Sequence, residues 1–257
     1  MIREYLRPNS IEETLSLLSE TGKERRPMGG GTSLSRQQTS LVGVVDLQNV
    51  GLDQISIQSQ EIRIGAMVRL ESLLMHPEVH PEIKRAIHID ASENIRNMAS
   101  LGGWLISSDG RSILTTALLA LDTNLTWEPE SFKVHMGDWL PMRANTFPGV
   151  LMTEALWWTG SYLVFEYVAR SPKDRPILVV AMAQWGSGRT RVALGGFGNA
   201  PMIAMDGPDS SGVDVASKDA CAEAEDQWAS AEYRQDVAAN LAQRCLRRIE
   251  TLISSEA

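Results

Sequence analysis

Two well-separated glycine clusters offer the clearest chemistry in this sequence. Gly29, Gly30 and Gly31 stand in succession, followed by hydroxyl side chains at 32 and 33, and a second cluster spans residues 100–103. Because glycine tolerates positive φ, successive backbone N–H groups can turn toward one point and surround phosphate oxygens. Residues 94–97, Asn-Ile-Arg-Asn, read as a helix end that brings a cation and two amides to a second backbone turn. Together the clusters predict a nucleotide or flavin site.

Their spacing disfavours the common nucleotide-binding motifs. No Gly-Lys-Ser/Thr follows either cluster, as a Walker loop requires, and neither has the Gly-x-Gly-x-x-Gly spacing of a Rossmann turn. Three glycines alone are more often a flexible turn than a phosphate site, so the prediction depends on both clusters. The net charge of −8 argues against nucleic acid or an anionic membrane as the main partner.

The cysteine and histidine residues of this sequence give little support for a metal site. Only Cys221 and Cys245 occur, without the ligand spacing of a zinc site or an iron–sulfur cluster, so any such centre must come from a partner. His76 and His80 stand four residues apart, but Pro77 interrupts the stretch between them. We therefore expect no metal site in this chain.

The N-terminus gives no sign of targeting to a membrane. The first eight residues lack the apolar core of a secretion signal, and no run of about 18 uncharged apolar residues occurs anywhere. We therefore expect a cytoplasmic protein without membrane insertion.

The hydrophobic pattern predicts an α+β protein in three segments. A strand at 4–7, a helix that begins with a capping box at 10–13, and a buried strand at 41–47 make an opening β-α-loop-β unit. Further expected elements are a hairpin at 55–65, a broken helical stretch at 69–98, a buried helix at 113–121, a strand at 125–127, loops and a short strand at 136–156, three strands within 162–196, a mobile loop at 206–217 and amphipathic helices within 219–253.

The order of these pieces resembles the flavin-binding medium subunit of the molybdenum hydroxylases, the xanthine dehydrogenase and carbon monoxide dehydrogenase family, over nearly the whole chain. Residues 29–34, Gly-Gly-Gly-Thr-Ser-Leu, look like that family's first flavin loop. Residues 95–103, Ile-Arg-Asn-Met-Ala-Ser-Leu-Gly-Gly, are similar to its second loop, and residues 117–122 look like the helix behind it. Residues 192–201 and 231–234 resemble its C-terminal domain.

This resemblance implies a PCMH-type FAD-binding fold. It implies two α+β FAD-binding subdomains at 1–55 and 56–158, and a C-terminal domain at 159–257 with a three-stranded sheet and a helical bundle. FAD is then held noncovalently, its pyrophosphate on the two glycine loops, and no His or Cys lies in or beside either loop for covalent attachment.

The resemblance also implies an oxidoreductase complex. In the family, the flavin takes electrons that began at a molybdenum centre and passed through iron–sulfur clusters, and delivers them to an acceptor such as NAD or oxygen. A small iron–sulfur subunit and a large molybdenum-cofactor subunit are therefore the expected partners.

The expected cofactor-binding residues are those of the two loops and their neighbours, and we expect no catalytic acid or base. They are Gly29, Gly30, Gly31, Thr32, Ser33, Leu34, Arg96, Asn97, Ser100, Leu101, Gly102, Gly103, Trp104 and Asp109.

Two residues depart from the family pattern. Trp104 stands where Asn or Asp is common, and its ring could stack beside the cofactor or block it. Ile113 stands where a carboxylate is usual, and Asp109 is a candidate replacement. These departures leave open an alternative, a structural or assembly scaffold that has lost or weakened FAD binding. A stand-alone flavin oxidase fits less well, because the C-terminal segment resembles the medium subunit.

Overall fold

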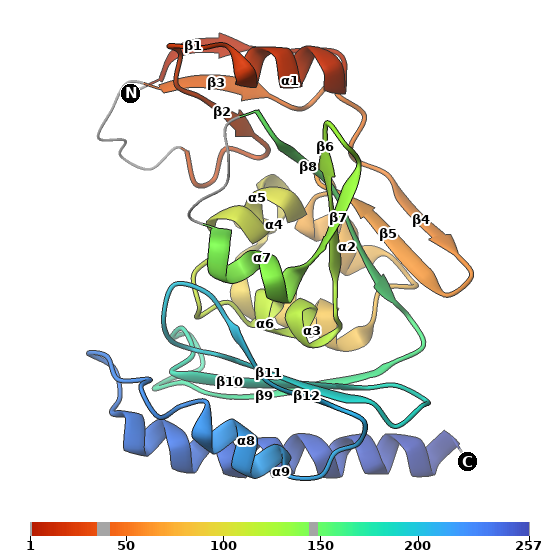
Figure 1. Ribbon diagram of the computed structural model, residues 1–257, viewed down its shortest axis with the longest axis vertical. Coiled ribbons are helices and arrows are strands. Elements are labelled where there is room, and N and C mark those ends of the chain that lie inside the picture. The colour runs from red at the N-terminus through yellow and green to blue at the C-terminus, as the bar shows by residue number, and fades with distance from the viewer. Residues whose placement is uncertain (1, 35–41, 144–148, 257) are drawn as a thin grey trace. The chain divides into compact units, whose positions relative to one another are not determined.

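The computed structural model describes residues 2–34, 42–143 and 149–256, and its chain divides into two compact units. Unit 1 comprises Met1–Pro77, Ala91–Ser107 and Asn124–Trp157, and unit 2 comprises Glu78–Asp90, Ser108–Thr123 and Trp158–Ala257. The α+β class expected from the sequence is confirmed (Figure 1). The division at 1–55, 56–158 and 159–257 stays a prediction.

Unit 1 begins with a parallel three-stranded sheet in the order β1-β3-β2, accompanied by helix α1. These elements are β1 (Ile2–Leu6), α1 (Ile11–Ser19), β2 (Arg25–Met28) and β3 (Val42–Asp46). Every residue of β3 is buried, as its apolar, β-branched run predicts for a central strand. The expected helix start is confirmed, since Ser10 Oγ accepts from the N–H of Glu13 at 3.1 Å.

The rest of unit 1 is built on a five-stranded sheet in the order β4-β5-β8-β6-β7. Its strands are β4 (Ile55–Gln58), β5 (Glu61–Gly65), β6 (Asn124–Glu128), β7 (Phe132–His135) and β8 (Leu151–Trp158), whose last residue falls in unit 2. Its helices are α2 (Leu70–Met75), α4 (Glu93–Met98), α5 (Leu101–Ser107) and α7 (Met136–Met142). Alternate residues of β5 and β6 are buried, so one face of the sheet packs into the core.

Unit 2 is an antiparallel sheet in the order β12-β11-β10-β9 with helices on both faces (Figure 1). Its elements are α3 (Pro81–Asp90), α6 (Ile113–Ala120), β9 (Tyr162–Val168), β10 (Leu178–Gln184), β11 (Thr190–Gly195), β12 (Met202–Gly207), α8 (Val213–Asp219) and α9 (Ala231–Glu256). One face packs Leu178, Val180 and Met182 against buried residues of α9, and α6 contacts β10 and β11 on the other.

The structure corrects several sequence predictions. The C-terminal sheet has four strands where three were expected, because β12 pairs with β11. Residues 206–217 hold the end of β12 and the start of α8 instead of a mobile loop. The range 136–156 holds helix α7 and most of the eight-residue strand β8, where loops and a short strand were expected. Leu41 and residues 144–148 lie outside the described part of the chain. None of the described helices combines the length and apolarity that crossing a bilayer requires.

Candidate functional site

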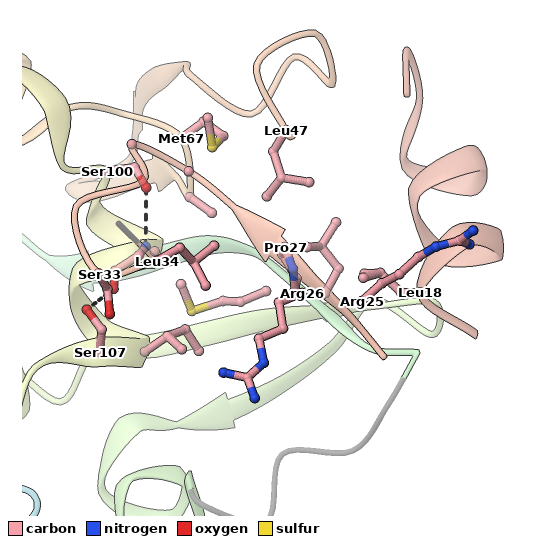
Figure 2. A pocket seen from close by; sticks show the side chains of 18 of the residues that line it. Leu18, Arg25, Arg26, Pro27, Ser33, Leu34, Leu47, Met67, Ser100 and Ser107 are labelled. Carbon is pink, nitrogen blue, oxygen red and sulfur yellow. Dashed lines mark hydrogen bonds between the residues drawn. The ribbon is translucent and has the colours of Figure 1, made fainter. Parts of the chain in front are cut away.

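A cavity of about 730 Å³ lies within unit 1, and both glycine clusters contribute to its wall. Residues of the segment from 23 to 34 line one part of it, and residues of α5 and of β8 line others. Figure 2 shows these side chains, with Ser33, Leu34, Ser100 and Ser107 among those labelled. The lining therefore joins segments that lie far apart in the sequence.

The first glycine cluster presents bare backbone to the cavity. Among the described residues, none forms a hydrogen bond with the N–H groups of Gly29, Gly30 or Gly31. Gly31 has a φ of 71°, the left-handed region that glycine adopts without steric cost. Thr32, Ser33 and Leu34 also line the cavity, so every residue expected from this cluster reaches it.

Two of these glycines are also required by packing against the second cluster. A Cβ on Gly29 would lie 2.2 Å from Ser100 Oγ, and one on Gly30 would lie 1.5 Å from the carbonyl oxygen of Met98. A Cβ does not fit at these distances, so the backbone of Gly29 packs against the Ser100 side chain and that of Gly30 against the Met98 backbone. The third glycine differs, because the nearest atom to a Cβ on Gly31 is Met28 Sδ at 3.6 Å.

The second cluster is the first turn of helix α5, not the backbone turn that we expected. Its N–H groups are already used: that of Leu101 donates to the Val68 carbonyl at 2.9 Å and that of Gly102 to the Ala66 carbonyl at 2.9 Å. The N–H of Gly103 donates to Ser100 Oγ at 3.2 Å. Ser100, Gly102 and Gly103 line the cavity, but the N–H groups of Gly102 and Gly103 are committed to the fold.

Four expected residues in or near α4 and α5 lie outside the cavity lining. Arg96 is buried and donates from Nε to Glu71 at 2.7 Å and from Nη1 to the Ala91 carbonyl at 3.0 Å. Asn97 is exposed and donates to the carbonyl of its own helix at Glu93. Leu101 is fully buried and Trp104 is half-buried. The Trp104 ring thus does not form part of the wall, and a binding role for these four residues stays a prediction.

Asp109 and Ile113 belong to unit 2 and are not among the residues that line the cavity of unit 1. Asp109 forms an ion pair with Arg175 and accepts from the N–H of Arg111 at 2.9 Å. Partial burial pushes the pKa of Asp109 up, but the hydrogen bonds and charges of Arg175 and Arg111 outweigh burial and hold it below its usual value. Ile113 is fully buried at the start of α6. Asp109 as a cofactor ligand stays a prediction.

The charged side chains at the cavity are paired with one another. Arg25 extends toward α1 in Figure 2 and binds Glu4 and Glu20, with only 3% of its side chain exposed. Arg26 pairs with Glu24 at 2.7 Å, both half exposed. Hydrogen bonds from Arg25 hold the pKa of Glu4 below its usual range. Because these acids and bases are paired, the described lining offers no unpaired general base.

The remaining wall is apolar, and the sequence analysis did not single it out. It includes Leu18, Leu47, Ala66, Met67, Ile106, Trp127, Leu151 and Met152. The apolar alternation of residues 125–127 predicted a strand. Nothing in that pattern indicated that the strand would face a cavity. Among the described residues, no group of three or more His, Cys, Asp or Glu side chains could hold a metal ion.

Comparison with known proteins places this chain in a family. The family described as "FAD binding domain in molybdopterin dehydrogenase" matches residues 1–154. An uncharacterised Escherichia coli K12 protein, YgfM, is 30% identical over 129 residues, covering 49% of this chain and 50% of its own length. The chain thus spans half the length of that relative.

Two further similarities extend over most of the chain. The glyceraldehyde dehydrogenase medium chain of Sulfolobus acidocaldarius is 27% identical over 220 residues, covering 79% of this chain and 78% of its own length. A chain in a crystal structure of Cu,Mo-CO dehydrogenase has the same fold, with a TM-score of 0.82 and 24% identity, covering 96% of this chain and 97% of that one. The chain described here belongs to the family of FAD-binding domains of molybdopterin dehydrogenases.

Proposed function

We propose that this chain is the FAD-binding medium subunit of a molybdenum hydroxylase-type oxidoreductase. It holds FAD noncovalently and carries electrons from the iron–sulfur clusters of a partner subunit to an acceptor such as NAD or oxygen. FAD supplies the ability to accept electrons from a one-electron carrier and to pass them on. The chain's own part is to bind and orient the cofactor.

The unpaired N–H groups of Gly29, Gly30 and Gly31 carry this proposal. Backbone donors that lack partners at a cavity wall can surround the oxygens of a pyrophosphate, which would otherwise lose its hydration at high cost. The cavity volume of about 730 Å³ lies within the range of about 300–1,000 Å³ typical of small-molecule sites. The apolar part of the wall suits a flat aromatic ring and excludes water from it.

The lining also favours electron transfer over acid–base chemistry. Its described residues include no His, Cys or Tyr, which supports noncovalent binding. Its acids and bases are engaged in ion pairs, so no side chain there is poised to move a proton to or from a substrate.

The cysteines support a separate iron–sulfur subunit. Cys221 and Cys245 are both buried, and burial raises their pKa values to about 11 and about 12. Iron–sulfur clusters are typically held by four cysteine thiolates, and this chain has only these two cysteines. Partner subunits that hold the clusters and the molybdenum cofactor form part of the proposal. So does a cytoplasmic location for this chain and its partners.

Of the two residues that suggested the scaffold alternative, Trp104 and Ile113, the first gives it less support. The Trp104 ring is absent from the cavity wall and does not fill the site. Ile113 still replaces a polar group, but its side chain is wholly buried.

The first experiment is to measure FAD per chain. Protein purified with excess FAD is separated from free cofactor and denatured, and the released flavin is quantified. We expect about one FAD per chain, with all of it released on denaturation because no covalent bond holds it. A content near zero would reject FAD binding and favour the scaffold, and flavin that stays with the denatured chain would reject noncovalent attachment.

A further inference from the structure

Trp127 has a buried hydrogen-bond donor that no described residue satisfies. Its indole Nε1 has no partner among the described residues and is shielded from solvent, and the side chain as a whole is 3% exposed. The indole N–H can only donate, so no rearrangement of its own hydrogen removes the deficit. Buried polar groups without a partner are rare in folded proteins, and each calls for an explanation.

Packing accounts for an aromatic ring at position 127 but not for the buried N–H donor of the Trp127 indole. The ring lies beside that of Trp139, with centroids 5.6 Å apart and planes tilted by 46°. A phenylalanine would make the same kind of contact without burying a donor. The requirement for an indole must therefore come from something other than the aromatic pair.

The position of Trp127 connects this donor to the cavity. Trp127 lines the cavity, whereas Arg63 and His76, which hold the other unsatisfied buried side-chain nitrogens in the described chain, do not. Directly across from Trp127 in the strand pairing lies Met152, which lines the same cavity. An unbranched thioether shifts easily between conformers, so the wall beside Trp127 can adjust to an occupant.

The neighbouring wall supplies no acceptor for this donor. Met152, directly across in the strand pairing, is apolar, and no described residue accepts a hydrogen bond from Trp127 Nε1. An occupant of the cavity that Trp127 lines can supply the acceptor. We propose that Trp127 is a binding residue for FAD, its indole ring packing against the cofactor and its N–H donating to a cofactor oxygen or ring nitrogen. This inference rests on the proposed function.

Loss of the donor is expected to weaken binding measurably. A neutral hydrogen bond in a shielded site contributes an amount that corresponds to about fivefold in affinity. Trp127→Phe keeps an aromatic ring and removes only the donor and part of the packing surface. Trp139→Phe is the matched control, because it alters the same aromatic pair but Trp139 does not line the cavity.

The test measures the affinity for FAD and follows the indole N–H of Trp127 by NMR. FAD is titrated into the cofactor-free wild type and both variants, and each variant's thermal transition confirms that it folds. In parallel, the seven tryptophans are labelled with ¹⁵N at the indole nitrogen, and the Trp127 signal is assigned by its loss in Trp127→Phe. We expect FAD to move this signal downfield and slow its hydrogen exchange, and Trp127→Phe to raise the Kd about fivefold, with Trp139→Phe within about twofold of the wild type.

The outcomes separate this inference from the proposed function. If the wild type takes up no FAD, both are rejected. If the wild type binds FAD but the Trp127 signal stays in place, or the two variants bind equally well, the role of Trp127 is rejected while FAD binding stands. If Trp127→Phe does not fold, the Trp127 signal is assigned by elimination, from single phenylalanine substitutions of the other six tryptophans, and the wild-type spectrum then decides the question.

Discussion

Gly31 lines the cavity with backbone in the left-handed region, but no tight packing contact requires a glycine there. Its φ of 71° requires the left-handed region, yet a Cβ there would find its nearest atom 3.6 Å away. Gly29 and Gly30, in contrast, are fixed by contact with Ser100 and Met98. Of the three glycines, Gly31 is therefore the one at which backbone geometry can be altered without a steric clash.

Replacing Gly31 by alanine should weaken FAD binding more than it weakens the fold. An alanine at positive φ costs about 1 kcal/mol of stability and tilts the local N–H groups away from their common point. We expect a rise of about tenfold in the Kd for FAD, equivalent to about 1.4 kcal/mol, measured by equilibrium titration.

Gly51 provides the control for this change. Its φ is 80°, a Cβ would meet nothing within 4 Å, and it does not line the cavity. Gly51→Ala should therefore show a similar loss of stability in urea unfolding with an unchanged Kd. Equal losses of affinity in both variants would show that general strain, not the placement of the Gly31 N–H groups, controls binding.

Helices α3 and α6 are joined by one buried carboxylate. Asp90 ends α3 and accepts from Ser112 Oγ at 2.8 Å and from the N–H groups of Ile113 and Leu114 at 3.0 and 2.9 Å. Burial raises the pKa of Asp90 from 3.8 to about 6, and these hydrogen bonds oppose that rise only in part. The carboxyl thus caps α6 at the cost of carrying a buried charge at neutral pH.

The titration of Asp90 should make the stability of unit 2 depend on pH. Because the folded pKa lies above the unfolded value, the folded state holds the proton more tightly, and this contribution is complete below about pH 4 and lost as pH rises through about 6. Asp90→Asn does not titrate. We expect the difference in free energy of unfolding, wild type minus variant, to fall by about 2 kcal/mol between pH 4 and 7, measured by urea unfolding.

Asp109 gives a control of opposite sign. Its folded pKa is lowered, so the stability that its ion pair contributes is present above the unfolded pKa and is lost as pH falls. The difference between wild type and Asp109→Asn should therefore grow with rising pH over the acid range. A difference for Asp90→Asn that stays constant or grows with pH would contradict the burial argument.

At the scale of the whole molecule, the described chain forms a cofactor cavity but offers no metal centre that could pass electrons to a cofactor there. Its two cysteines are buried, and its described residues offer no metal-binding cluster. Under the proposed function, the FAD bound here takes its electrons from a carrier that a partner subunit holds.

Isolation from the native host should therefore recover a complex. A tagged chain is expected to bring down two further polypeptides, with iron and molybdenum measured by elemental analysis and flavin measured after denaturation. Washing at high salt serves as the control against loose charge-driven association of this acidic chain. Repeated recovery of a stable, flavin-loaded chain without iron or molybdenum would argue against obligate assembly.

The sequence by itself determined the features that depend on neighbouring residues. The capping box at Ser10, the buried strand at 42–46 and the exposed backbone of Gly31 follow from local conformational preferences, which act within a few residues. The order of such motifs also identified the family over the segment that the family description matches.

Only the tertiary structure decided which of these features reach the cavity. The N–H groups of Leu101 and Gly102 are consumed by carbonyls more than thirty residues earlier, at Val68 and Ala66, and Arg96 pairs with Glu71. Trp127 faces the cavity because strand β6 pairs with β8, a strand that the sequence analysis read mostly as loops. Such pairings depend on contacts between distant segments, and no local pattern of residue types encodes them.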